Sequence, residues 1–208
     1  LSLNIDKIWR KKAVKRICKN LRDSESHVLD VACGTADSSI ALAKAGIPFV
    51  TGIDISERMI KVGEEKIKSL NLNNINLKVE DCENLSFEDN SFDSAFIAFG
   101  IRNFEDKKKG LNELRRVLKD NGHLLILELS VPQNKILLSL YKLYFLHILP
   151  FIGKKISGDS KAYTYLPNSV MNFPKPKEFM AIMEECGFKN VKQKALTFGL
   201  CRIYEGFN

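Results

Sequence analysis

Three short apolar runs in the first half of the chain are each accompanied by an acidic residue. The first run contains Asp30 and is closed by Gly34, and the second ends at Asp54, 20 residues after that glycine. A carboxylate at Asp54 can accept hydrogen bonds from both hydroxyl groups of a ribose. After the third run, Asp81 and Cys82 place an acid beside a small residue, a pair that can hold an exocyclic amine and flank an aromatic base. Together the three loops predict a site for an adenosine.

The glycine content of the first loop distinguishes between classes of nucleotide. Only Gly34 in residues 30–37 matches the GxGxxG pattern of dinucleotide-binding loops, so a pyrophosphate could not pack against three glycines. This argues against a nicotinamide oxidoreductase and excludes a P-loop. A nucleoside cofactor without a pyrophosphate grip points to S-adenosylmethionine. Asp54 could instead cap the helix that follows it, but Ser56 is better placed for that role.

The three loops must be held at one edge of a sheet, and the surrounding sequence predicts such a sheet. Strand patterns alternate with helical patterns through residues 28–130, with a loop before the fourth strand. This order predicts a parallel α/β sheet with right-handed crossovers, which binds its ligand at the carboxyl edge. We expect strands at residues 28–33, 49–53, 75–79, 93–99, 124–129, 191–195 and 200–204. We expect helices at residues 36–45, 56–70, 105–118 and 177–186, the third of them ended by Asn121-Gly122.

The length of 208 residues predicts one domain over residues 1–208. A basic amphipathic helix at residues 6–21 lies in an N-terminal segment, residues 1–22, that precedes a cofactor-binding core at residues 28–130. We expect an insertion at residues 135–174 to cover the substrate. Its stretch 136–146 is apolar on nearly every face but too short to span a bilayer. This stretch could cover an apolar substrate tail, dip into a membrane surface or form a buried lid helix.

Charge and cysteine usage limit the classes of partner. Residues 1–22 carry eight basic side chains and one acid, residues 23–130 carry 13 and 19, and residues 131–208 carry 11 and five. Basic flanks around an acidic core suit an anionic membrane surface, although solvated faces explain them equally well. Because no zinc-finger or RNA-binding signature is present, we expect no nucleic-acid partner. Five scattered cysteines without a CxxC pair predict a reduced cytoplasmic protein without a metal site, peripheral at most on the inner face of the cytoplasmic membrane. The first residue is Leu and no signal-peptide layout follows, so we expect a piece of a longer protein.

Motifs spread over almost the whole chain resemble the class I methyltransferases, and within them the C-methyltransferases of ubiquinone and menaquinone biosynthesis. The segments that carry this resemblance are residues 1–9, 28–37, 85–87, 90–93, 99–103, 116–119, 128–130, 147–150 and 163–166. The overall match is more similar to the demethylmenaquinone branch than to the benzoquinol branch. The chain departs from the family pattern at four places. The family usually has a His near Asp6 and a second glycine at the position of Ala36. It often has a Ser at the position of Ala98 and usually a Pro-Gly turn at Asp120-Asn121.

The resemblance implies a fold, a reaction and a set of cofactor contacts. The fold is the class I S-adenosylmethionine-dependent methyltransferase fold, which is Rossmann-like with a seven-stranded, mostly parallel sheet and a helical insertion. The reaction is C-methylation of a reduced prenylated quinone. The substrate expected here is a prenylated naphthoquinol, demethylmenaquinol, and the product is menaquinol. The residues expected to contact S-adenosylmethionine are Asp30, Gly34, Thr35, Asp54, Ile55, Asp81, Cys82 and Ala98.

The resemblance also places Arg102 in the catalytic centre. A guanidinium is a poor base but a good stabiliser of a developing phenolate. The candidates for the proton acceptor are Asp159, which we favour, and His147, Tyr163 and Tyr165, all within the insertion. His147 could instead be a helix-face residue, and the two tyrosines could be core residues.

Three other functions stay open, because a fold does not prove a reaction. They are C-methylation of a benzoquinol precursor of ubiquinone, O-methylation of a small molecule, and non-catalytic binding of a quinone or lipid. The segment 99–103 disfavours O-methylation, and the retained acids Asp54 and Asp81 disfavour a non-catalytic role. A homodimer is also an open prediction.

Overall fold

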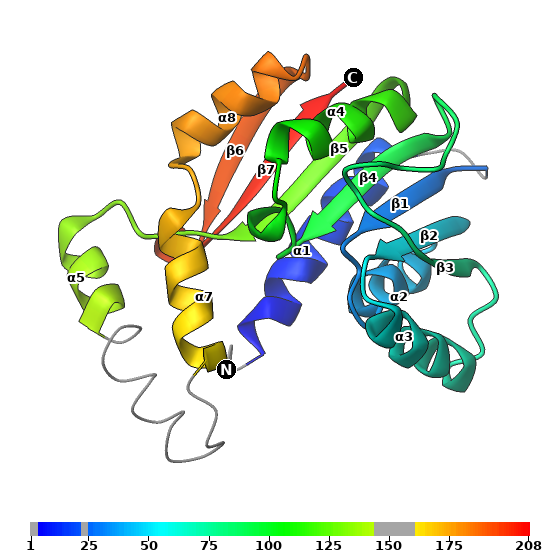
Figure 1. The fold of residues 1–208 in the computed structure, drawn as a ribbon, viewed down its shortest axis with the longest axis horizontal. Helices are drawn as coiled ribbons and strands as arrows, with labels where there is room; N and C mark the ends of the chain where they lie inside the picture. The colour runs from blue at the N-terminus through cyan, green and yellow to red at the C-terminus, as the bar shows by residue number, and fades with distance from the viewer. Residues whose placement is uncertain (1–3, 22–24, 144–160) are drawn as a thin grey trace.

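The computed structural model describes residues 4–21, 25–143 and 161–208. Seven strands form one sheet in the order β3-β2-β1-β4-β5-β7-β6 (Figure 1). The first five strands in this order are parallel, whereas β7 runs antiparallel to both β5 and β6. The strands are β1 His27–Val31, β2 Phe49–Asp54, β3 Ile75–Val79, β4 Phe92–Ala98, β5 Leu118–Leu129, β6 Lys189–Leu196 and β7 Cys201–Phe207. The predicted seven-stranded, mostly parallel sheet is confirmed.

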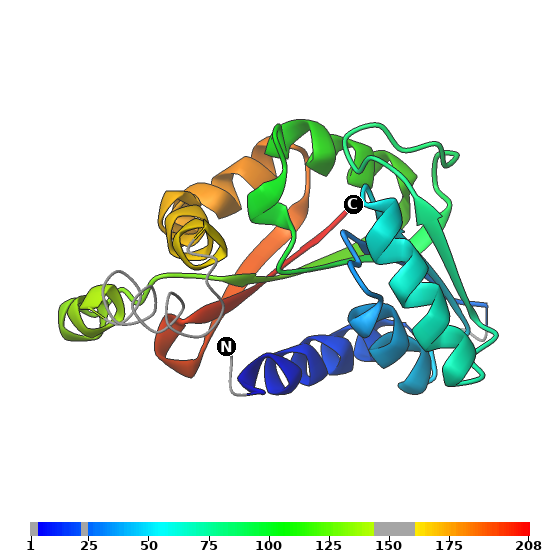
Figure 2. The same ribbon diagram turned by 60° about the horizontal axis from the view of Figure 1, so that its bottom comes forward.

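Helices cover both faces of this sheet (Figure 2). They are α1 Ile5–Asn20, α2 Asp37–Lys44, α3 Glu57–Ser69, α4 Lys107–Val117, α5 Lys135–Leu143, α7 Lys161–Asn172 and α8 Pro176–Glu185, with short 3₁₀ turns η1 Ile101–Asn103 and η3 Thr197–Gly199. One apolar cluster joins the sheet to α1 and α2, and a second joins its other face to α4 and α8. Within the described ranges, no helix combines the length and apolar character needed to cross a bilayer.

Local signals in the sequence explain most element boundaries. Ser56 lies at the N-cap of α3, where its hydroxyl accepts a hydrogen bond from the Met59 N–H at 3.4 Å. The predicted cap is therefore confirmed. In α1, the residues Trp9, Ala13 and Ile17 recur every four positions and are buried against the sheet. This spacing leaves the basic residues of α1 on its outer side.

One detail of the predicted elements is wrong. The Asn121-Gly122 pair does not end α4, which stops at Val117; the pair lies inside the longer strand β5. The register between β4 and β5 shifts there, from Phe92 opposite Leu118 to Ser94 opposite His123. Asn121 has a φ of 60°, so the pair forms the irregular turn of a bulge in place of a helix end.

The predicted loop before the fourth strand is confirmed, because residues 80–91 contain no helix between β3 and β4. This segment is a loop whose turns are held by side chains. Arg116 on α4 donates hydrogen bonds to the carbonyl oxygens of Leu85 and Phe87 at 3.0 and 2.8 Å. The Leu85 N–H donates to Glu113 at 3.0 Å. The loop is therefore fixed on α4, with its first residues at the carboxyl edge of the sheet.

Candidate cofactor site

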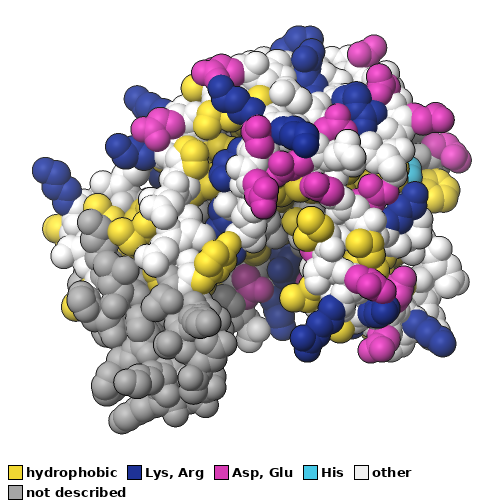
Figure 3. All heavy atoms as spheres, in the orientation of Figure 1, with side chains coloured by type: hydrophobic (Ala, Val, Ile, Leu, Met, Phe, Trp, Pro, Cys, Tyr) yellow, Lys and Arg dark blue, Asp and Glu magenta, His cyan; other side chains and the backbone are white. Residues whose placement is uncertain are grey.

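A cavity of about 380 Å³ opens at the carboxyl ends of β2, β3 and β4. The space-filling view shows a recess between the α7 side and the α3 side of this face, with acidic side chains gathered above it (Figure 3). Among the residues that the structure describes, its lining includes neither lysine nor arginine but five carboxylates, which are Asp54, Glu80, Asp81, Glu83 and Glu105. Such a lining repels phosphates and suits a ligand that offers hydroxyl or amino donors and a positive charge. The sequence prediction of a nucleoside without a pyrophosphate fits this electrostatic character.

Asp54, at the end of β2, occupies the position from which a ribose could be held. One of its oxygens accepts a hydrogen bond from the Gly34 N–H at 2.8 Å, and the other accepts from the Ser56 N–H at 2.9 Å. Each carboxylate oxygen has a second lone pair, so hydroxyl donors can still be accepted. The carboxylate thus joins the β1 and β2 loops and faces the cavity beside Ile55.

Asp30 lies beneath the β1 loop and is fully buried. The Ser39 hydroxyl donates to one of its oxygens at 2.6 Å, whereas the other oxygen has no hydrogen-bond partner among the described residues. Burial raises the pKa of Asp30 from 3.8 to about 7, although the Ser39 hydrogen bond and the charge of Arg10 oppose the shift. An acceptor left over in a buried position is unusual in a folded protein and fits an amino or hydroxyl donor from a ligand.

The strands β1 and β4 approach each other closely beside the cavity. A Cβ on Gly100 would lie 2.6 Å from the Cβ of Ala32, so only glycine fits at position 100. Ala32 and Phe99 both have positive φ values, 53° and 62°. Strained backbone of this kind is often retained at functional sites. It allows the backbone of both strand ends to line the cavity without bulky side chains.

The other predicted cofactor residues lie at different distances from this cavity. Asp81 and Cys82 line it, and burial together with the neighbouring carboxylates raises the pKa of the Cys82 thiol to about 12. The Thr35 hydroxyl instead accepts a hydrogen bond from Lys66 on α3 at 2.7 Å. Ala98 packs against the apolar cluster on the α1 side and is not part of the lining. The cofactor roles of all these residues stay predictions.

Arg102 lies just past β4 and is held by a buried ion pair. Its guanidinium contacts Glu128 at 2.7 Å and also donates to the Phe99 carbonyl oxygen. Glu128 is fully buried at the end of β5, and its second oxygen accepts from the Arg102 N–H at 3.3 Å. Burial raises the pKa of Glu128, an effect that the Arg102 charge opposes. The Nε of Arg102 is buried without a partner among the described residues, which leaves one N–H available for an anion.

Tyr141 on α5 is the second polar side chain near Arg102. It is only 7% exposed. Burial raises the pKa of its phenol to about 12, although the Arg102 charge lowers it in part. The phenol is therefore neutral near pH 7 and can donate a hydrogen bond.

The candidate proton acceptors are only partly described by the structure. The Tyr165 hydroxyl donates to the Asn103 side-chain oxygen at 2.9 Å, next to the cavity. Tyr163 belongs to α7, but its side chain lies outside the described part of the chain. His147 and Asp159 also lie outside the described residues.

Sequence reasoning did not single out six polar residues that the structure places in the cavity or near Arg102. They are Glu80, Glu83, Asn103, Glu105, Glu128 and Tyr141. Asn103 and Glu128 belong to segments that carry the family resemblance, and Glu80 directly follows a strand, so signals for these three existed. Tyr141 had no such signal, because its place relative to Arg102 depends on tertiary packing.

The raised pKa of Asp30 predicts a pH-dependent stability. A folded-state pKa near 7 against 3.8 means that the free energy of unfolding falls as pH rises through this range. Asp30→Asn removes this dependence, so its stability relative to the unaltered protein should rise by on the order of 3 kcal/mol between pH 5 and pH 8. Urea unfolding at the two pH values measures this, with Glu65→Gln on the exposed side of α3 as control. Equal stability differences at both pH values would contradict the assignment.

Comparisons with known proteins agree with this geometry. The ubiE/COQ5 methyltransferase family matches the chain over residues 1–208. A demethylmenaquinone methyltransferase of Bacteroides fragilis is 43% identical over 98% of this chain and 83% of its own length. A ubiquinone/menaquinone biosynthesis C-methyltransferase of Geotalea uraniireducens is 46% identical over 99% of this chain and 87% of its own length.

Solved structures share the fold at lower identity. A SAM-dependent methyltransferase from Aquifex aeolicus superposes with a TM-score of 0.64 at 20% identity, covering 93% of this chain and 88% of its own. The predicted class I fold and S-adenosylmethionine as cofactor are confirmed, and the acidic lining and the spare acceptor on Asp30 fit that cofactor. The full-length family match and the identity to curated relatives show that this chain belongs to the ubiE/COQ5 family of methyltransferases.

Proposed function

We propose that this methyltransferase transfers the methyl group of S-adenosylmethionine to a ring carbon of a reduced prenylated naphthoquinone, converting demethylmenaquinol to menaquinol. The observation that carries this proposal is the 43% identity, over nearly the whole chain, to a protein named demethylmenaquinone methyltransferase. The reaction forms a carbon–carbon bond and breaks the sulfonium carbon–sulfur bond. The ring loses a proton, and a neutral thioether leaves.

The acidic cavity is the proposed cofactor site. Asp54 would accept the ribose hydroxyls, Asp81 the exocyclic amine of the base, and the spare oxygen of Asp30 an amino group. When bound, S-adenosylmethionine supplies an electrophilic methyl group. The surplus of carboxylates favours its positive charge over the neutral product, which would assist product release.

The Arg102–Glu128 pair is the proposed means of activating the acceptor. A quinol carbon becomes nucleophilic when the adjacent hydroxyl loses its proton, so a phenolate must be stabilised. Arg102 offers for that oxygen a buried Nε–H that has no partner among the described residues, and Glu128 holds the guanidinium in place. The neutral phenol of Tyr141, on whose pKa the Arg102 charge acts, is a further polar group near this position. Asp159 remains our leading proton acceptor, with His147, Tyr163 and Tyr165 as the other candidates.

A second acceptor has separate support. Several relatives, including the Geotalea protein, carry names that join ubiquinone and menaquinone biosynthesis. A benzoquinol precursor of ubiquinone is therefore the alternative substrate.

Three finer proposals accompany this function. We propose contact with a membrane surface, because a prenylated quinol dissolves in the bilayer. We also propose that residues 135–174 cover the substrate, and that a homodimer forms, which analytical ultracentrifugation would detect.

The first prediction concerns the acceptor. The full-length protein is given methyl-labelled S-adenosylmethionine with chemically reduced demethylmenaquinone or with a reduced methoxybenzoquinone precursor. Label should appear in the demethylmenaquinone acceptor alone. Label in both acceptors would indicate an enzyme of both pathways. Bound cofactor without label in either acceptor would overturn the proposed function.

The second prediction concerns Asp54. Asp54→Asn removes a negative acceptor from the cavity, so binding of S-adenosylmethionine should weaken on the order of 10- to 100-fold by calorimetry. The Glu65→Gln variant removes the same charge from α3 outside the cavity and should bind normally. Unchanged affinity in Asp54→Asn would exclude this carboxylate from the cofactor site.

The third prediction concerns Arg102. Arg102→Lys keeps the charge beside Glu128 but loses the guanidinium fork, so methyl transfer should fall at least about 100-fold. Cofactor affinity should change little, because Arg102 is not part of the cavity lining. Arg115→Lys on α4, an arginine exposed far from the site, is the matched control. A normal rate in Arg102→Lys would remove this side chain from the chemistry.

A further inference from the structure

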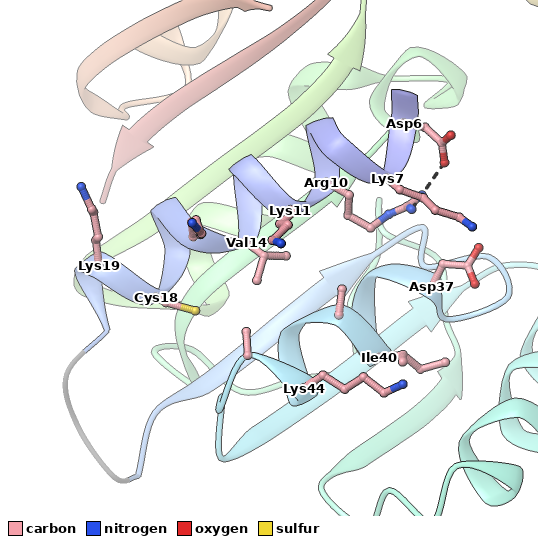
Figure 4. A pocket seen from close by; sticks show the side chains of 13 residues that line it. Asp6, Lys7, Arg10, Lys11, Val14, Cys18, Lys19, Asp37, Ile40 and Lys44 are labelled. Atoms are coloured by element: carbon pink, nitrogen blue, oxygen red, sulfur yellow. Dashed lines mark ion pairs between the residues drawn. The ribbon is translucent and has the colours of Figure 1, made fainter. Parts of the chain in front are cut away.

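A groove of about 830 Å³ runs between α1 and α2, outside the cofactor cavity (Figure 4). Its walls carry basic side chains from both helices, with Lys11 on α1 and Lys44 on α2. Its floor is apolar and includes Val14, Ile40 and Ala41. An apolar floor beneath a basic rim is the surface that an anionic amphiphile requires.

Most of the positive charge of this groove is not neutralised by the residues that the structure describes. The two carboxylates in the lining already have partners: Asp6 contacts Arg10 at 3.6 Å, and Asp37 contacts Lys66 at 2.9 Å. The remaining lysines of the lining form no ion pair with any residue that the structure describes, and they are Lys7, Lys11, Lys15, Lys19 and Lys44. Four of them recur every four residues along the exposed side of α1. They form one continuous row of unpaired charge.

The floor of the groove is suited to hydrocarbon. Val14 is buried, and Ile40 and Ala41 are half-buried. Cys18 also faces the groove (Figure 4). Burial raises the pKa of its thiol, so Cys18 is a neutral, weakly polar group here. A phosphate on the rim could therefore be accompanied by apolar atoms below.

Apolar side chains also project beside α1. Ile8 is 56% exposed and Phe198, in the turn between β6 and β7, is 82% exposed. That turn is fixed to α1 because Trp9 donates a hydrogen bond to the Thr197 hydroxyl at 2.8 Å. Three consecutive residues, 197–199, have positive φ values of 44°, 56° and 91°. The turn therefore keeps left-handed backbone at two non-glycine residues and leaves the Phe198 ring exposed.

This surface lies near the carboxyl edge of the sheet, where the cofactor cavity opens; we call this edge the catalytic edge. The Trp9 ring lies 6.3 Å from the ring of Phe99, which directly follows β4. One end of the lysine row therefore adjoins the edge where the cofactor cavity opens. The exposed side chains of Ile8 and Phe198 would add nothing to the binding of RNA phosphates, whereas both side chains can enter a bilayer interface.

We propose that the α1–α2 groove and the adjoining Phe198 turn form a docking surface for a bilayer rich in anionic phospholipid. The lysine row binds the headgroup phosphates, and the apolar floor accepts acyl-chain atoms. This inference rests on the proposed function, since a membrane-dissolved quinol gives the docking its purpose. The docked orientation keeps the catalytic edge beside the bilayer that holds the acceptor.

Vesicle co-sedimentation of the full chain tests this proposal without cofactor or quinol, so its outcome is independent of methyl transfer. The vesicles are phosphatidylcholine alone and an equimolar mixture with phosphatidylglycerol. The protein should sediment with the mixture only. Lys11→Gln/Lys44→Gln, which removes one exposed lysine from each wall of the groove, should weaken binding on the order of 10-fold.

The matched control is Lys109→Gln/Lys177→Gln. It removes the same charge from exposed positions of α4 and α8, on the other face of the sheet. This variant should bind the mixed vesicles as the unaltered protein does. Phe198→Ser should weaken binding as well, with its unfolding temperature unchanged because the side chain is exposed.

Three outcomes would overturn the proposal. One is absence of binding to the anionic vesicles, and another is an equal loss of binding in both double variants, which would indicate net charge alone. The third is binding of RNA, in a gel-shift assay, that is lost only in Lys11→Gln/Lys44→Gln while vesicles are not bound. Methyl transfer to an acceptor without a prenyl chain should be normal in both double variants, which separates failed docking from failed catalysis.

Discussion

The parallel register of three neighbouring strands is the constraint on which the site depends. Val31 at the end of β1 stands opposite Ile53 of β2 and opposite Ile97 of β4. The three strands therefore finish at one level, and their following loops meet. Because the loops lie next to each other, the Asp54 carboxylate accepts a hydrogen bond from the Gly34 N–H of the neighbouring loop. A register shift of one residue would move every side chain of a strand to the opposite face of the sheet, and the cavity would be lost.

Two electrostatic environments lie side by side at this edge. The described lining of the cofactor cavity holds carboxylates and no lysine or arginine, whereas Arg102 lies just beyond it against the buried Glu128. The acidic side suits a sulfonium and its nucleoside, and the cationic side suits a phenolate. Because a buried pair costs desolvation energy on both partners, its presence here fits the proposed stabilisation of a phenolate better than a gain in stability.

The two sides of helix α1 have different roles. Its buried side, with Trp9, Ala13 and Ile17, anchors it to the sheet. Its outer side carries the lysine row of the groove beside α2. The Trp9 indole also fixes the turn that exposes Phe198. One helix thus couples core packing, the catalytic edge and the proposed docking surface.

The order of strands and helices, the α3 cap and the acids of the cofactor loops all followed from the sequence. They could, because alternation, capping and the position of loops after strands are local patterns of side-chain type. The Asn121-Gly122 pair was misassigned because the same two residues suit a helix end and a bulge, and only pairing with β4 decides between them.

Tertiary structure alone decided which polar groups meet. The sequence identified Arg102, but Glu128 is its partner only because β4 and β5 are neighbours in the sheet. Likewise, the charge of Arg102 acts on the phenol of Tyr141 in α5, and Thr35 contacts Lys66 because α3 packs beside the β1 loop. These contacts join residues up to several elements apart, and their distances depend on packing that no local pattern encodes. The sequence by itself therefore determined the fold class, the position of the loops proposed to hold the cofactor and the candidate reacting residues, whereas the three-dimensional packing determined partners, burial and charge state.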